Sequence, residues 1–159
     1  MMLRFVIHFM ADIHAPFHTI NRYHPDFKNG DEGATLFGLI DPEVPNLHEL
    51  WNKACKFLPS YPQPLEQQSI DDLILRANQV IALFPRATFS PEELSLYEGY
   101  AILTHMNGPH VTAREKGYRG VTPFQEIPPV YLNLAAFQSK RMLALAGYRL
   151  ANVLQQMFP

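Results

Sequence analysis

The sequence predicts a mainly α-helical protein that forms a single domain over residues 1–159. Apolar residues recur at helical spacing in several segments, most clearly over residues 131–158. Prolines cluster between these segments, where a proline ends a helix. With 47% hydrophobic residues, a chain of this length can bury a sufficient core without disulfides, and its single cysteine, Cys55, has no second cysteine to pair with.

Capping patterns locate the helices in the middle of the chain. Three of them place a capping side chain three residues before an acidic one: Asn46 with Glu49, Ser69 with Asp72, and Ser90 with Glu93. The predicted helices are residues 3–15, 46–57, 69–84, 90–106 and 131–158. Residues 19–45 and 107–130 are expected to be loops, and within the first of them residues 35–40 can form a short strand.

The first predicted helix is apolar on nearly all sides, which is typical of a buried helix, and Pro16 ends it. Its apolar start is interrupted by His8 and Asp12 and lacks a small-residue cleavage site, so we expect no signal peptide. No apolar run approaches the roughly 20 residues of a membrane span. The net charge of −2 argues against a nucleic-acid binder that relies on bulk positive charge.

Histidines are concentrated in the first third of the chain. His8 and Asp12 are four residues apart and therefore share a helix face. His18 follows the break at Pro16, where the chain can turn back toward them. His48 lies on the first turn of the next predicted helix, with Asn52 on the same face. Because zinc takes imidazole nitrogen and carboxylate oxygen as ligands, these positions predict a metal site.

Other interpretations of the same residues remain open. A lone histidine on an apolar helix is commonly a hydrogen-bonded core residue, and a His/Asp pair on a helix is commonly a simple ion pair. His24 is expected at the surface, and the aromatic residues of the last helix are expected in the core.

Three motifs resemble one known family. Residues 8–18, His-Phe-Met-Ala-Asp-Ile-His-Ala-Pro-Phe-His, are similar to a signature of the zinc-dependent single-strand nucleases of moulds and plants, which share a fold with bacterial zinc phospholipase C. Residues 46–52, Asn-Leu-His-Glu-Leu-Trp-Asn, resemble the family's Asn-Leu-His-x-x-Trp-Asp motif. Residues 146–151, Ala-Gly-Tyr-Arg-Leu-Ala, resemble its closing helix.

The resemblance implies zinc-dependent hydrolysis of phosphodiester bonds in single-stranded DNA or RNA, of the endonuclease and 3′-nucleotidase type. By position, His8 is similar to a ligand of a zinc pair, and Asp12 to the carboxylate that bridges the pair beside the catalytic water. His18 and His48 are similar to ligands of a third zinc, for which Asn52 stands where the family has a carboxylate. His14 is next to the site and is not a ligand in the family.

The loop of residues 31–35 resembles one that borders the substrate cleft, with Asp31 and Gly33 retained and Thr35 in place of asparagine. In the same loop, Ala34 replaces a glycine and disfavours a positive φ.

The match covers the C-terminal part of the family, whose N-terminal part supplies further zinc ligands. We therefore expect a protein partner that covers the helix of residues 3–15 and completes the metal site. Two readings follow. The chain is part of a zinc nuclease that acts on single-stranded nucleic acid, or it is a nuclease-like scaffold that serves as a structural or assembly subunit with one zinc or none. Members of the family are usually exported, and the sequence does not indicate the cellular compartment of this chain.

Overall fold

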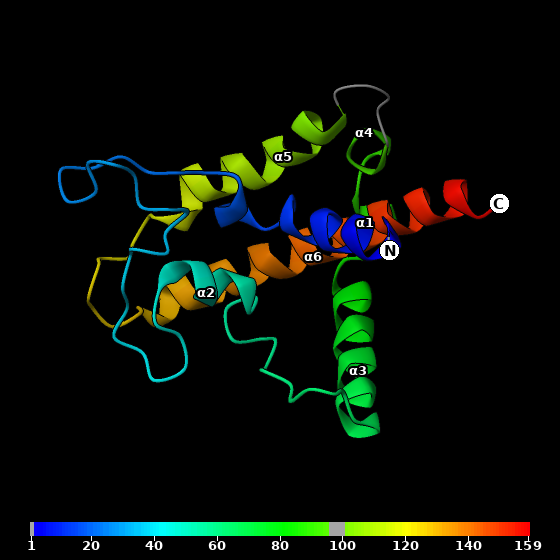
Figure 1. The fold of residues 1–159 in the computed structure, drawn as a ribbon, viewed down its shortest axis with the longest axis horizontal. Helices are drawn as coiled ribbons and strands as arrows, with labels where there is room; N and C mark the ends of the chain where they lie inside the picture. Colours follow the sequence, from blue (N-terminus) through cyan, green and yellow to red (C-terminus); the bar gives the residue numbers. More distant parts are fainter. Residues whose placement is uncertain (1, 96–100) are drawn as a thin grey trace.

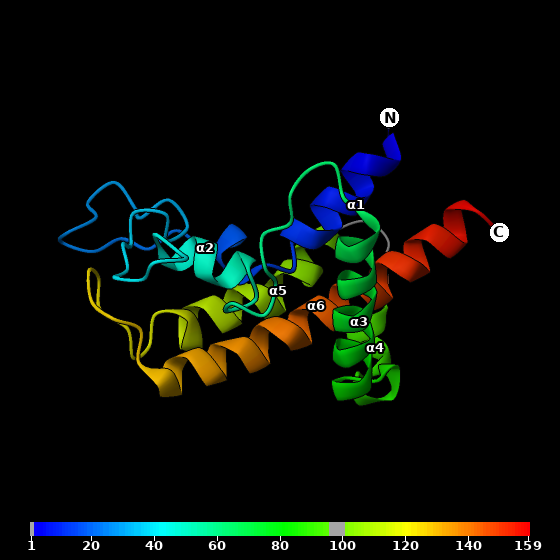
Figure 2. The same ribbon diagram turned by 90° about the horizontal axis from the view of Figure 1, so that it is seen from below.

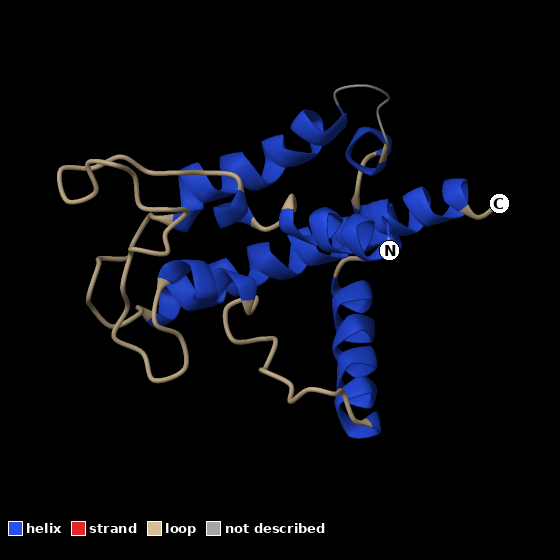
Figure 3. Cartoon of the chain, in the orientation of Figure 1, coloured by secondary structure: helices blue, strands red, loops and turns tan. Residues whose placement is uncertain are grey.

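The computed structural model describes residues 2–95 and 101–159, and this part of the chain is mainly α-helical, as predicted (Figure 3). Its helical segments follow in the order α1 (Met2–Asp12), η1 (Pro16–His18), α2 (Leu47–Asn52), α3 (Gln67–Leu83), η2 (Arg86–Thr88), α4 (Pro91–Leu94), α5 (Ala101–Thr112), η3 (Ala113–Gly117) and α6 (Pro129–Met157). None of the helices in these residues is long and apolar enough to cross a membrane.

Helix α6 is the axis of the molecule. It runs along the longest dimension, and the other helices are arranged around it (Figure 1). Helices α1, α2, α3 and α4 all contact it, and α3 points away from it at a steep angle (Figures 1 and 2). The side chains that α6 buries recur at helical spacing, and they include Tyr131, Ala135, Met142, Leu145 and Arg149. One long amphipathic helix therefore supplies a wall for most of the core.

The core consists of two hydrophobic clusters on this helix. The larger one lies at the N-terminal half of α6 and includes Phe17, Phe37, Leu47, Trp51 and Tyr131. The smaller one lies between α3 and the C-terminal half of α6 and includes Val80, Phe84, Phe89 and Leu145. The first cluster forms the floor beneath η1 and α2, which carry the candidate site residues.

Helix α1 is less buried than its sequence predicts. One face packs on α6, but Leu3, Phe5, Ile7 and Phe9 are between 40% and 56% exposed. Its N-terminal end leaves the surface of α6 (Figure 2). The prediction of a buried helix is therefore wrong for this chain as described, because no other described segment covers the outer face.

Several helix boundaries also differ from the predictions. Helix α1 ends at Asp12 rather than residue 15, and α2 ends at Asn52 rather than residue 57. Residues 54–56 stop α2 because all three take left-handed backbone conformations, with φ between 45° and 69°. Helix α3 begins at Gln67, before the predicted cap Ser69, and its actual N-cap, Glu66, makes no side-chain capping bond.

Within the expected loop of residues 107–130, residues 107–117 are helical, which corrects that part of the prediction. Helix α5 continues through Asn107-Gly108-Pro109 to Thr112, and a π-helical turn follows to Gly117. Proline disfavours a helix partly through a clash with the Cβ of the preceding residue, and Gly108 has no Cβ. The predicted helix of residues 90–106 crosses residues 96–100, which lie outside the described part of the chain.

No strand is present in residues 2–95 and 101–159, so the expected short strand at residues 35–40 is wrong. This segment instead forms a single bridge between Gly38 and Asn46, and Asn46 caps α2 by accepting a hydrogen bond of 2.8 Å from the Glu49 amide.

A buried chain of hydrogen bonds ties α2 to η3 and α6. The Trp51 indole donates to the Tyr131 hydroxyl at 2.8 Å, and that hydroxyl donates to the Gly117 carbonyl at 2.5 Å. We expect Tyr131→Phe to lower the free energy of unfolding by about 2 kcal/mol, because it leaves a buried indole N–H and a buried carbonyl unpaired. Urea denaturation followed by circular dichroism measures this loss.

Tyr23→Phe is the matched control, because Tyr23 is 69% exposed and the same hydroxyl is removed at the surface. We expect its free energy of unfolding to stay within about 0.5 kcal/mol of the parent value. Equal losses in the two variants would contradict the importance of the buried chain.

Candidate functional site

Asp12 lies at the end of α1, between two histidines. His8, one turn earlier on the same helix, places Nε2 3.2 Å from Asp12 Oδ2. His18, in η1, places Nδ1 4.0 Å from the same oxygen. The break at Pro16 reverses the chain between them, because proline fixes its own φ and starts the short 3-10 turn. The structure therefore brings His8, Asp12 and His18 together, as their spacing predicts.

His18 links this group to α2. Its Nε2 donates a hydrogen bond of 3.2 Å to Asn52 Oδ1, and its ring centroid is 4.7 Å from that of His48. His48 and Asn52 are one turn apart on α2 and share a face. All five residues that the sequence singles out as ligands, His8, Asp12, His18, His48 and Asn52, form one continuous cluster.

His48 is oriented by the loop beneath it. Its Nδ1 donates to the Gly33 carbonyl at 2.8 Å, which leaves Nε2 as the ring's acceptor nitrogen. Histidines that bind metals commonly donate their other ring N–H to a carbonyl in this way. Gly33 has φ of 65°, and a Cβ at this position would lie 2.4 Å from the Phe17 carbonyl oxygen. Only glycine fits this position without rearrangement.

The other residues of the expected substrate loop differ in their exposure to solvent: Asp31 is buried, and Thr35 is exposed. Asp31 is fully buried and accepts hydrogen bonds from the Arg22 amide at 3.0 Å and the Tyr118 hydroxyl at 2.6 Å. Burial, together with this bond, raises the pKa of Tyr118 far above its ordinary value. Asp31 therefore fastens the loop to the core. Thr35 is exposed and donates to the Glu32 carbonyl at 2.9 Å.

Ala34 takes the positive φ that the sequence predicts to be disfavoured, with a value of 66°. Its methyl group is fully buried in the larger hydrophobic cluster, which compensates for the strain of this conformation. The loop thus keeps a glycine-like backbone without the glycine.

A buried pair that the sequence did not predict supports the cluster. His14 and Arg149 are 2% and 5% exposed, and Arg149 Nη1 donates to His14 Nε2 at 2.8 Å. His14 Nδ1 donates to the Met10 carbonyl at 2.7 Å, and Arg149 Nε donates to the Glu93 carbonyl at 2.6 Å. These bonds join the end of α1 to α6 and α4. His14 is a positioning residue beside the cluster.

A cavity of about 400 Å³ opens beside the cluster. His8, Asp12, His18 and Asn52 line one part of it, and side chains of α6 such as Ser139 and Met142 line another. Neighbouring Cys55 is buried against Ser139, and burial raises the pKa of its thiol to about 12. Near neutral pH the free thiol is therefore protonated and a poor nucleophile.

The donor set alone does not complete a zinc site. Within the described residues, no three or more side chains of the types histidine, cysteine, aspartate and glutamate are grouped so that they could hold one ion. His8 and Asp12 supply two ligands, whereas zinc in proteins takes about four. His18 and His48 supply two imidazoles, but Asn52 adds only a neutral amide oxygen. By itself, the cluster in the described residues offers too few ligands for a zinc ion.

The mainly helical fold is consistent with that of a nuclease-like hydrolase. The family model described as S1/P1 nuclease matches residues 1–159, the whole chain. The chain therefore belongs to the S1/P1 nuclease family, and the resemblance inferred from its motifs is confirmed. Members of this family are in general zinc-dependent. No curated protein and no solved structure matches the chain.

We expect His14→Ala to lower the free energy of unfolding by about 3 kcal/mol, because it removes a buried partner of the Arg149 guanidinium. The matched control is His24→Ala, because the His24 side chain is 41% exposed and its ion pair is with Asp26, which is also exposed. Chemical denaturation of both variants measures the difference. A His14 variant as stable as the His24 variant would show that the buried pair is dispensable.

Proposed function

We propose that this chain contributes part of the active site of a zinc-dependent phosphodiester hydrolase that acts on single-stranded DNA or RNA, of the endonuclease or 3′-nucleotidase type. The observation that carries the proposal is the cluster itself. Three separate segments, α1, η1 and α2, bring His8, Asp12, His18, His48 and Asn52 side by side. Family membership supports a nuclease-like hydrolase.

The residues of the chain have two roles in this proposal. Asp12 is the only carboxylate of the cluster, and it faces both His8 and His18. Its oxygens are therefore the position at which a cation is best balanced by negative charge. His48 is held by the Gly33 carbonyl, so its Nε2 lone pair is set before any ligand arrives. Asp12 would thus bind the cation, and His48 would present a nitrogen that is already oriented toward it.

The remaining ligands come from outside these residues, in a protein partner that covers α1. The exposed side chains of Leu3, Phe5, Ile7 and Phe9 support this part of the proposal, because an apolar patch of this kind is typical of a contact surface. Phe5 and Phe9 stack with their ring centroids 5.9 Å apart, next to His8 on the same helix. A partner that packs there would lie close to the incomplete zinc site.

The second candidate is a nuclease-like scaffold that has lost catalysis. Two observations favour it: Asn52 at the place of a carboxylate, and the lack of a group of three ligands in the described residues. In this reading the same apolar face of α1 serves assembly, and the cluster is a network of hydrogen bonds. The two candidates differ in whether the assembled protein contains zinc and cleaves nucleic acid.

The deciding experiment measures zinc per chain in the assembled protein and its cleavage of single-stranded DNA, for the parent and for Asp12→Asn. About three zinc ions per chain, and a loss of at least about a hundredfold in rate in the variant, are the expected results. Asp26→Asn is the control, because Asp26 is a surface carboxylate that also pairs with a histidine. An assembly without zinc, or an Asp12 variant with full activity, would favour the scaffold.

The neutral amide at position 52 gives a separate prediction. We expect Asn52→Asp to tighten zinc binding by roughly tenfold or more, because a carboxylate is a stronger ligand than an amide and balances the charge of the ion. Competition with a fluorescent zinc chelator measures the affinity. Asn29→Asp, at an exposed position outside the cluster, should leave the affinity unchanged. Equal affinity in the parent and both variants would argue against a zinc at His18 and His48.

A further inference from the structure

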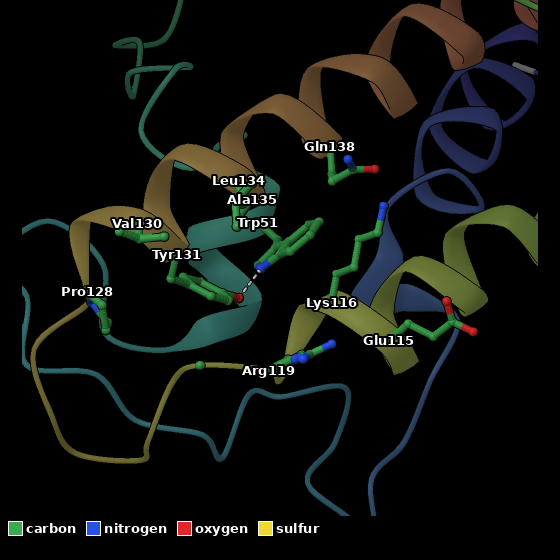
Figure 4. A pocket seen from close by; sticks show the side chains of 11 residues that line it. Trp51, Glu115, Lys116, Arg119, Pro128, Val130, Tyr131, Leu134, Ala135 and Gln138 are labelled. Carbon is green, nitrogen blue, oxygen red and sulfur yellow. Dashed lines mark hydrogen bonds between the residues drawn. The ribbon is translucent and has the colours of Figure 1, made fainter.

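A second cavity shares Trp51 with the cavity beside the histidine cluster. It has a volume of about 550 Å³ and lies between the N-terminal half of α6 and the segment of residues 115–120 (Figure 4). This volume is in the ordinary range of small-molecule sites. Apart from Trp51, its lining residues are different from those of the histidine cavity.

The floor of this cavity is aromatic and rigid. Trp51 and Tyr131 are 4% and 5% exposed, and the hydrogen bond between them is drawn in Figure 4. The Tyr131 hydroxyl is fixed in turn by the Gly117 carbonyl, so both rings are held in place before a ligand binds. Val130 and Leu134 add apolar surface and are 72% and 64% exposed. Val130 and Leu134 therefore supply the accessible apolar surface, and the fixed pair of rings lies beneath it.

The rim of the cavity is positively charged. Lys116 and Arg119 line it, and neither forms an ion pair or a side-chain hydrogen bond within the described part of the chain. Glu115, the acidic residue of the lining, is bound by Arg114 at 3.0 Å, so its charge is offset. In a chain with a net charge of −2, two unpaired cations on one cavity mark a place where an anion is favoured.

We propose that this cavity binds a small organic phosphate monoester with a flat apolar body. The body packs against the exposed side chains of Val130 and Leu134, above the buried pair of Trp51 and Tyr131, and the phosphate lies at the cationic rim that Lys116 and Arg119 line. The Gln138 amide, on the α6 side of the cavity, supplies a donor and an acceptor for a polar edge of the ligand. The proposal concerns residues outside the histidine cluster and does not rest on the proposed function.

Trp51 makes the proposal testable, because it is the single tryptophan of the sequence and forms part of the cavity. The experiment titrates the full chain with phenyl phosphate in the presence of a metal chelator and follows indole fluorescence. We expect phenyl phosphate to bind saturably. Inorganic phosphate and phenol should each bind at least about tenfold more weakly, because inorganic phosphate lacks the apolar ring and phenol lacks the phosphate. Equal binding of inorganic phosphate would overturn the proposal.

Charge variants locate the binding. Lys116→Ala and Arg119→Ala should each weaken phenyl phosphate binding by roughly tenfold. The matched controls, Lys28→Ala and Arg4→Ala, remove exposed cations from outside the cavity and should leave the affinity unchanged. Circular dichroism verifies that each variant is folded. Binding that survives both cavity substitutions, or that is lost only in His18→Ala, would place the ligand elsewhere and overturn the proposal.

Discussion

The contact between Arg149 and His14 is the constraint on which the candidate site depends. A buried guanidinium is costly unless its N–H groups have partners, and the structure supplies the His14 ring and the Glu93 carbonyl. His14 also bonds back to Met10, so the end of α1 is fixed to α6 by one side chain. Asp12 comes two residues before this anchor and His18 four residues after it. The Arg149–His14 bond therefore helps to set the distance between Asp12 and His18, although it involves neither residue.

The site could be predicted from the sequence to the extent that it depends on local spacing. His8 and Asp12 share a helix face because they are four residues apart, and Pro16 turns the chain so that His18 returns to them. The burial of Asp31 could not be predicted in this way. It depends on Tyr118, which is 87 positions away in the sequence and reaches Asp31 only through the folded core. The contact between Arg149 and His14 likewise joins residues 135 positions apart, so the motif of residues 146–151 that contains Arg149 does not by itself predict it.

In the fold, too, features decided by neighbouring residues could be predicted, and features decided by tertiary packing could not. Asn46 was correctly predicted as a cap because capping is decided within one helical turn. The continuation of α5 through Gly108-Pro109 was missed because glycine and proline together usually indicate a turn. The missing Cβ of Gly108 and the burial of Pro109 favour the helix instead. Tertiary packing decides such cases, and it leaves no local pattern in the sequence.

The left-handed run at residues 54–56 has a consequence for how this chain tolerates mutation. Non-glycine residues in this conformation cost about 1 kcal/mol each, and hydrogen bonds such as Cys55 N–H to the Leu50 carbonyl, 2.8 Å long, maintain the turn. Glycine normally weakens a folded protein by adding freedom to the unfolded chain. At Ala54 the relief of strain opposes that effect, so glycine becomes one of the mildest replacements in an otherwise closely packed region. Larger side chains at this position meet both the strained backbone angle and the close packing, whereas glycine avoids both.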